Sequence, residues 1–112
     1  MQQIKNGVVA KNLLQIGENM REKELERKLV KAVKSMGGIC PKFTSPGFDG
    51  MPDRLVLLPK NRIAFVEVKR HGKLPTTLQL SRHGMLQKLG FAVYVLDCDA
   101  NIEEVLREIQ TT

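Results

Sequence analysis

The strongest pattern along the chain is a helical spacing of apolar residues that begins after Arg21. Lysine and arginine fill the outer face of this stretch, and Gly37-Gly38 ends it, as glycine commonly does at a helix C-terminus. The pattern therefore predicts an amphipathic helix over residues 21–36. Its predicted buried side chains are Leu25, Leu29, Ala32, Val33 and Met36.

Short stretches rich in apolar and β-branched residues predict strands. Pro59-Lys60-Asn61 separates the second and third of these stretches and predicts a β-hairpin. A loop dense in turn residues, 44–52, precedes the hairpin. The predicted strands are residues 39–43, 54–58, 62–69 and 91–96.

Two more helices are predicted in the second half of the chain. Thr76 or Thr77 can cap a helix that runs to Leu89, and Gly90 stops it. Asn101 and Glu104 form a capping box for the last helix. Its inward side chains are Ile102, Val105, Leu106 and Ile109.

The order of elements predicts an α/β fold, α-β-β-β-α-β-α. Residues 91–96 need a helical crossover to return beside the hairpin, so we expect a central mixed sheet of about four strands flanked by helices. A single domain over residues 21–112 accommodates these elements. Residues 1–20 are polar and interrupted by glycine, and we interpret them as an N-terminal arm or a short helix.

Composition narrows the class of protein. Apolar residues make up 42% and charged residues 27% of the chain, as in soluble globular proteins, and the longest apolar runs are too short to cross a bilayer. The start of the chain lacks a secretory signal core, and Cys40 and Cys98 are predicted to be reduced thiols of a cytoplasmic protein. The formal net charge of +6 favours a polyanionic partner, although basic faces also keep ordinary proteins soluble.

Charged residues interrupt the most apolar predicted strand. Glu67 and Lys69 are two residues apart, so they project from the same face of the strand. A three-residue hairpin turn would place Asp53 directly opposite Glu67, whereas a four-residue turn would place it opposite Val68 unless a bulge intervened. Two adjacent carboxylates repel each other unless they are protonated or bridged by a cation.

The register that places Asp53 opposite Glu67 predicts a site for Mg²⁺ or Mn²⁺, which prefer oxygen ligands and bind phosphate. Such an ion can polarise a phosphoryl group and lower the pKa of a bound water, while Lys69 orients that water or stabilises developing charge. The alternative interpretation is an ordinary ion pair between Glu67 and Lys69 on the edge of the sheet.

Pro52-Asp53, fourteen positions before Glu67-Val68-Lys69, resembles the PD-(D/E)XK motif of the restriction-endonuclease-like nucleases. Within that superfamily, residues 21–98 of this sequence most resemble the VRR-NUC family. The matching segments are 42–47, 50–54, Gln79-x-x-x-His83 and 89–96. The resemblance implies a restriction-endonuclease-like core and a stand-alone phage or bacterial enzyme. It also implies a homodimer that, like Holliday-junction resolvases, acts on branched DNA.

Residue roles follow from this resemblance at the matching positions. Asp53 and Glu67 match the metal-binding acids and Lys69 the catalytic lysine, and the carbonyl of Val68 is implied as a further metal ligand. Glu26 resembles the first-helix glutamate of the resolvases, although it also fits a solvated charge. Glu22 and Glu24 are less well placed to reach the site.

The second predicted helix is expected to contribute to the same site. Gln79 precedes His83 by four residues, so both lie on one helical face, and the resemblance gives Gln79 a catalytic supporting role. Gln79 could equally be an ordinary polar residue near a helix start. His83 is interpreted as a hydrogen-bonded core histidine.

Basic and polar residues around these motifs are predicted to hold DNA phosphates without reading the bases. The chain has no Trp, one Tyr and four Phe, so a stacking platform for single strands is not expected. The predicted phosphate contacts are Lys42, Ser45, Arg54, Arg70, His71, Lys73 and Arg82.

The sequence thus favours a Mg²⁺-dependent endodeoxyribonuclease, selective for DNA structure and homodimeric. It would act in the cytoplasm of a bacterial host cell and be encoded by a phage or prophage. No membrane and no small-molecule cofactor are expected. The alternatives are a nicking or site-specific nuclease without junction preference and a DNA-binding module without catalysis. An RNA substrate also stays open, because nothing in the sequence reads the 2′-hydroxyl.

Overall fold

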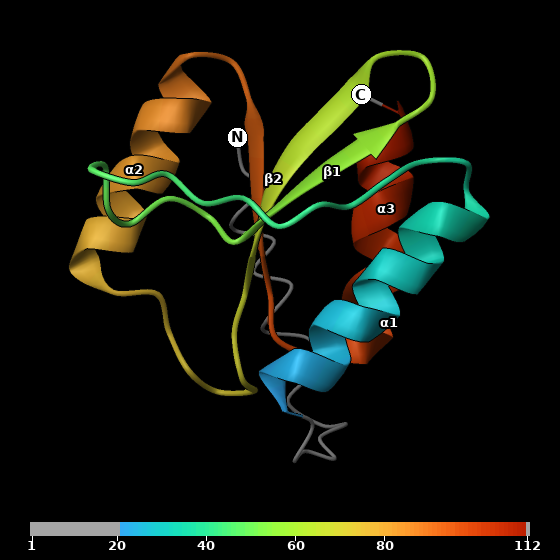
Figure 1. Ribbon diagram of the computed structural model, residues 1–112, viewed down its shortest axis with the longest axis horizontal. Coiled ribbons are helices and arrows are strands. Elements are labelled where there is room, and N and C mark those ends of the chain that lie inside the picture. Colours follow the sequence, from blue (N-terminus) through green and yellow to red (C-terminus); the bar gives the residue numbers. More distant parts are fainter. Residues whose placement is uncertain (1–20, 112) are drawn as a thin grey trace.

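The structure is a computed structural model that describes residues 21–111 (Figure 1). The N-terminal arm or short helix predicted within residues 1–20 lies outside the described residues. Between residues 21 and 111 no helix is long and apolar enough to cross a membrane. The elements in chain order are α1 (Glu22–Ser35), β1 (Arg54–Leu58), β2 (Arg62–Val68), α2 (Thr77–Lys88), β3 (Ala92–Leu96), a 3₁₀ turn η3 (Asp99–Asn101) and α3 (Ile102–Thr111).

The three strands form one mixed sheet in the order β1-β2-β3. β1 and β2 are antiparallel neighbours, and β3 runs parallel to β2 after the crossover through α2, as predicted. Helix α2 covers one face of the sheet, while α1 and α3 lie together on the other (Figure 1). The mixed α/β architecture is therefore confirmed.

The predicted strand over residues 39–43 is wrong in its extent, and the described sheet has three strands instead of about four. Residues 39–43 run antiparallel to β1 but form only two isolated bridges, Ile39 with Leu57 and Lys42 with Arg54. Backbone hydrogen bonds join Ile39 to Leu57 in both directions, and Leu55 donates to the Pro41 carbonyl. Because Pro41 has no N–H to return that bond, the ladder is interrupted at its centre.

Apolar side chains pack on both faces of the sheet. The larger core lies between the sheet and the pair α1 and α3. Most of the predicted inward residues are buried in it, namely Leu25, Leu29, Val33, Ile102, Val105, Leu106 and Ile109, whereas Ala32 and Met36 are partly buried and pack against it. A smaller core under α2 consists of Phe65, Leu86 and Val93. Cys40 and Cys98 are buried and form no disulfide, and burial raises the pKa of the Cys40 thiol to about 11.

The hairpin has the three-residue turn that the favourable register required. Leu58 pairs with Arg62 and Arg54 with Val66, leaving Pro59-Lys60-Asn61 as the turn. Lys60 and Asn61 adopt left-handed backbone angles, with φ of 67° and 65°. Asparagine tolerates this conformation better than most residues, so the local sequence suits the turn.

The end of α1 approaches β1 so closely that only glycine fits. Gly37 has a φ of 86° and follows the last turn of the helix. A Cβ atom on Gly38 would lie 2.2 Å from the backbone carbonyl oxygen of Leu57. Gly38 therefore allows the chain to turn directly from α1 to the edge of the sheet.

We predict that Gly38→Ala lowers the free energy of unfolding by about 1–3 kcal/mol, because the added methyl group meets backbone instead of a flexible side chain. Urea unfolding followed by circular dichroism would measure this change. Gly84→Ala is the matched control: no atom lies within 4 Å of its added Cβ, so the helical residue should gain about 0.5–1 kcal/mol. Equal stability of the two variants would contradict the close approach at Gly38.

Candidate active site

Asp53 and Glu67 form a carboxyl pair at one end of the β1–β2 hairpin. The pairing of Arg54 with Val66 continues to Asp53 and Glu67, so the predicted register is confirmed. Oδ2 of Asp53 accepts a hydrogen bond from the Val68 N–H at 3.0 Å. Burial, the charge of Glu67 and a hydrogen bond between the two carboxyl groups raise the pKa of Asp53 to about 6. The Asp53 carboxyl therefore binds its proton more tightly than a solvated aspartic acid does.

Glu67 is almost fully buried, with 1% of its surface exposed, and α2 supplies its partners. Nε2 of Gln79 donates to Oε2 of Glu67 at 3.1 Å, and Nε2 of His83 lies 3.4 Å from Oε1. The predicted common face of Gln79 and His83 thus points at the carboxylate. His83 is itself 1% exposed, which agrees with its interpretation as a core histidine.

Gln79 performs two tasks with one side-chain amide. Its oxygen accepts a hydrogen bond from the Thr76 N–H, while the Thr76 hydroxyl accepts one from the Gln79 N–H, which completes a capping box. Thr76 is therefore the cap that the sequence left open between two threonines. The amide nitrogen of Gln79 remains for Glu67, so the start of α2 fixes the position of the carboxylate.

The Val68 carbonyl points toward the same side as the Asp53 carboxylate. The Lys69 N–H donates to the Leu96 carbonyl of β3 at 2.9 Å. In a trans peptide the C=O and the N–H of the next residue point in opposite directions, so the Val68 carbonyl faces away from β3. That direction leads past the start of β1, where Asp53 lies.

Lys69 follows Glu67 by two residues and shares its sheet face. The residue is partly exposed directly after β2. Within residues 21–111 no ion pair engages its ammonium group. The Glu67–Lys69 surface ion pair considered from the sequence is therefore absent from the described residues.

Glu26 approaches the carboxyl pair from α1 but is bound to Arg54. The Nε and Nη2 atoms of Arg54 both lie 2.8 Å from Oε1 of Glu26, and Nη1 donates to the Cys40 carbonyl at 2.9 Å. Both side chains are mostly buried. Glu26 is still near enough for its charge to contribute to the raised pKa of Asp53. Arg54, predicted to hold phosphate, instead connects α1 with the start of β1.

Glu22 is the site-proximal residue that sequence reasoning underrated. Its Oε2 accepts a hydrogen bond from the Arg70 N–H at 3.2 Å, directly beyond Lys69. Glu22 precedes Glu26 by four residues, so both lie on one face of α1. This spacing was the signal that could have identified it.

The other predicted phosphate contacts fall into two groups. Lys42, Arg70 and Lys73 are exposed, whereas Ser45 and His71 are partly buried. Arg82 holds the loop before β1, because its Nε donates to the Asp49 carbonyl at 2.7 Å and its guanidinium stacks 3.9 Å from the Phe48 ring centre. Arg54 and Arg82 thus have structural partners, and the exposed residues are the better placed for DNA.

The donor set fits a magnesium ion. Asp53 and Glu67 offer two carboxylates in contact, and the Val68 carbonyl is directed toward the same place. No cluster of three or more His, Cys, Asp or Glu side chains with metal-binding geometry occurs in the described part of the chain. Mg²⁺ commonly uses one or two carboxylates and completes its shell with water and phosphate oxygens, so two suffice.

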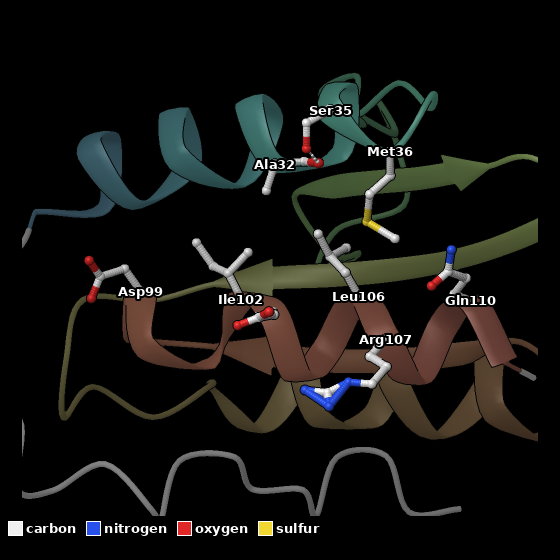
Figure 2. A pocket seen from close by; sticks show the side chains of 9 residues that line it. Ala32, Ser35, Met36, Asp99, Ile102, Leu106, Arg107 and Gln110 are labelled. Carbon is white, nitrogen blue, oxygen red and sulfur yellow. Dashed lines mark hydrogen bonds between the residues drawn. The ribbon is translucent and has the colours of Figure 1, made fainter.

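A groove of the protein lies away from the carboxyl pair. This groove of about 450 Å³ runs between α1 and α3 and includes Ala32, Met36, Ile102 and Leu106 in its lining (Figure 2). None of the residues of the carboxyl pair or its supports lines this groove. The candidate site instead lies at the end of the β1–β2 hairpin, where Glu67 is buried and Asp53 is partly exposed.

Comparison with known proteins agrees with the fold. No family model matches the sequence. The chain is 51% identical over 78 residues to "Putative nuclease p44" of Acyrthosiphon pisum secondary endosymbiont phage 1, covering 70% of this chain and 84% of that protein. A solved VRR_NUC domain superimposes with a TM-score of 0.74 and 29% identity, covering 80% of this chain and 97% of the domain.

The fold and the carboxyl pair define a restriction-endonuclease-like domain. Together with these two relatives, they show that the chain belongs to the VRR-NUC family of nucleases.

We predict that Asp53→Asn stabilises the metal-free protein at pH 8 by on the order of 1 kcal/mol, after allowance for solvent screening at this partly exposed site. The folded-state pKa of Asp53 is raised from 3.8 to about 6, so its contribution to stability is fully present below pH 3.8 and is lost as the pH rises through 6. Asparagine avoids this loss and can still accept from the Val68 N–H.

Urea unfolding in EDTA at pH 8 and near pH 4 would measure this difference. The advantage of Asp53→Asn should shrink at the lower pH. Asp49→Asn removes the same charge from an exposed loop and serves as the control. An Asp53→Asn protein less stable than the unmodified one at pH 8 would show that the two carboxylates do not oppose each other.

Proposed function

We propose that this protein is a Mg²⁺-dependent endonuclease that hydrolyses phosphodiester bonds in DNA. The observation that carries the proposal is the placement of Asp53 opposite Glu67, with Lys69 on the same sheet face. In a family of nucleases, two opposed carboxylates beside a lysine have a direct chemical use. A module that only binds DNA would gain nothing from carboxylates that repel phosphate.

Asp53, Glu67 and the Val68 carbonyl would hold the ion. When bound, Mg²⁺ would supply charge neutralisation at the phosphate and lower the pKa of a water molecule. The Asp53 carboxyl must lose its proton for this, so binding should weaken as the pH falls below about 6.

The remaining residues orient and stabilise. Gln79 and His83 fix Glu67, so little reorganisation is needed when substrate arrives. The Lys69 ammonium would orient the attacking water or stabilise negative charge that develops on the phosphate. Glu26, through its contact with Arg54, would hold α1 against the start of β1 and could add charge to the metal site.

DNA with branched or other non-linear structure is the substrate that we propose, cut by a homodimer. The exposed cations Arg70 and Lys73 follow Lys69 directly, and Lys42 lies on the α1 side of the site. Contacts of this kind position the backbone without reading sequence, which favours recognition of shape. Cutting both strands symmetrically requires two active sites, and one small chain provides one.

We predict that the protein cuts end-labelled DNA with Mg²⁺ or Mn²⁺ and not with EDTA. The substrates are a linear duplex, a flap and a four-way junction, and the branched forms should be cut faster. Asp53→Asn and Lys69→Ala should each reduce the rate by roughly 100-fold or more, because each removes a group that acts on the reacting phosphate. Lys88→Ala removes an equal charge from the end of α2 and should cut normally.

Equal cutting of all three substrates would show general nicking activity and contradict junction selectivity. Binding of DNA without any metal-dependent cutting, unchanged by either substitution, would instead identify a DNA-binding module. Preferential cutting of an RNA duplex of the same sequence would reassign the substrate.

We predict a dimer in solution. Sedimentation at micromolar protein should give a species of twice the 12.6 kDa chain mass. A monomer with full cutting activity at the same concentration would contradict this part of the proposal.

A further inference from the structure

Asp97 is a buried acid at the carboxyl end of the sheet that the proposed chemistry does not use. It directly follows β3 and is 2% exposed. Val68 pairs with Leu96 in the parallel ladder, so Asp97 lies beside Lys69. Side chains alternate along strands, which places Asp97 on the same face as Glu67 and Lys69.

The contacts of Asp97 all go to the turn that follows Lys69. Its Oδ2 accepts a hydrogen bond from the Gly72 N–H at 3.3 Å. Nδ1 of His71 lies 3.6 Å from the same oxygen. Within residues 21–111, Oδ1 of Asp97 is buried without a hydrogen-bond partner. Burying a carboxyl group with one oxygen unpaired is unfavourable compared with an apolar residue of similar size, so packing alone does not account for it.

Residues 70–73 form a tight turn that is attached to the end of β3. The Lys73 N–H donates to the Arg70 carbonyl at 2.9 Å, and Gly72 has a φ of 85°, as the third position of a type II turn requires. The turn is exposed apart from His71. The end of β3 holds it at two points, because Leu96 accepts from the Lys69 N–H and Asp97 accepts from the Gly72 N–H.

We propose that Asp97 is a positioning residue that anchors the 70–73 turn to the end of β3. The anchor fixes the backbone on the far side of Lys69 and holds Arg70 and Lys73 where a DNA backbone can meet them. This inference rests on the proposed nuclease function for its effect on catalysis, whereas the anchor itself is a property of the free protein.

Trypsin provides a direct readout of the anchor, because Arg70 and Lys73 are its cleavage sites. Asp97→Ala should speed native-state cleavage after these two residues by about tenfold, the loss expected for one hydrogen bond, without faster cleavage elsewhere. Asp97→Asn should stay within about threefold of the unmodified protein, since its amide oxygen can still accept from Gly72. Asp99→Ala, at an exposed acid paired with Lys28, is the control.

DNA cleavage assays on the same variants test the catalytic consequence. Asp97→Ala should lower kcat about tenfold, and Asp97→Asn should restore most of it. Equal loss of activity in both variants with an unchanged trypsin pattern would overturn the proposal, because the charge would then act directly in the chemistry. Unaltered cleavage at Arg70 and Lys73 in Asp97→Ala would also overturn it.

Two further results keep the test decisive. If the unmodified protein cuts no DNA, the proposed function fails, and the trypsin pattern alone decides whether the anchor exists. If Asp97→Ala does not fold, hydrogen exchange of the Gly72 amide in the unmodified protein replaces it. A protected Gly72 amide supports the anchor, and free exchange overturns it.

Discussion

The register of the β1–β2 hairpin is the constraint on which the candidate site depends. A turn of three residues places Asp53 opposite Glu67, and one more residue would have moved Asp53 to the other face of the sheet. Lys60 and Asn61 accept left-handed angles to make the short turn. The chemistry at one end of the hairpin is therefore set by backbone geometry at its other end, five residue pairs away.

Burial and mutual repulsion disfavour two negative charges on Asp53 and Glu67, and neighbouring elements of the fold offset part of this cost. Glu67 is buried beneath α2, and two polar side chains from successive turns of that helix contact it, Gln79 and His83. Asp53 accepts from the Val68 N–H, lies against Glu67 and has a raised pKa. The two acids thus differ: Glu67 is buried and held by α2, whereas Asp53 is partly exposed and, in the proposed nuclease, would exchange its proton for a cation. An asymmetric pair of this kind is preorganised on one side and adaptable on the other.

The sequence predicted the central acids because strand periodicity and turn length are local properties. It also predicted that Gln79 and His83 share a face, since that depends only on helical spacing. The extent of the first strand was mispredicted, because one missing N–H at Pro41 interrupts a ladder that side-chain pattern alone suggests. The partners of Arg54 and Arg82 could not be predicted, because they lie 28 and 33 residues away along the chain. Asp97 escaped notice for the same reason: its burial and its bond to Gly72 arise only after β3 has crossed over to lie beside β2.

Carboxylates gather at one end of this basic protein, and the distribution of their partners explains how a polyanion could approach. Glu26 is bound by Arg54, Glu22 by the Arg70 N–H and Asp97 by the Gly72 N–H. These outer acids are separated from one another and each has a donor of the chain, whereas Asp53 and Glu67 have donors but also lie opposite each other. Above about pH 6 the Asp53 and Glu67 carboxylates therefore repel each other at the point where the proposed metal would bind. In the proposed nuclease, the cation must arrive before or with the phosphate, because the inner pair would otherwise repel it. Lys69, Arg70 and Lys73 then provide attraction for the DNA backbone, and of the outer acids Glu26 is neutralised by Arg54.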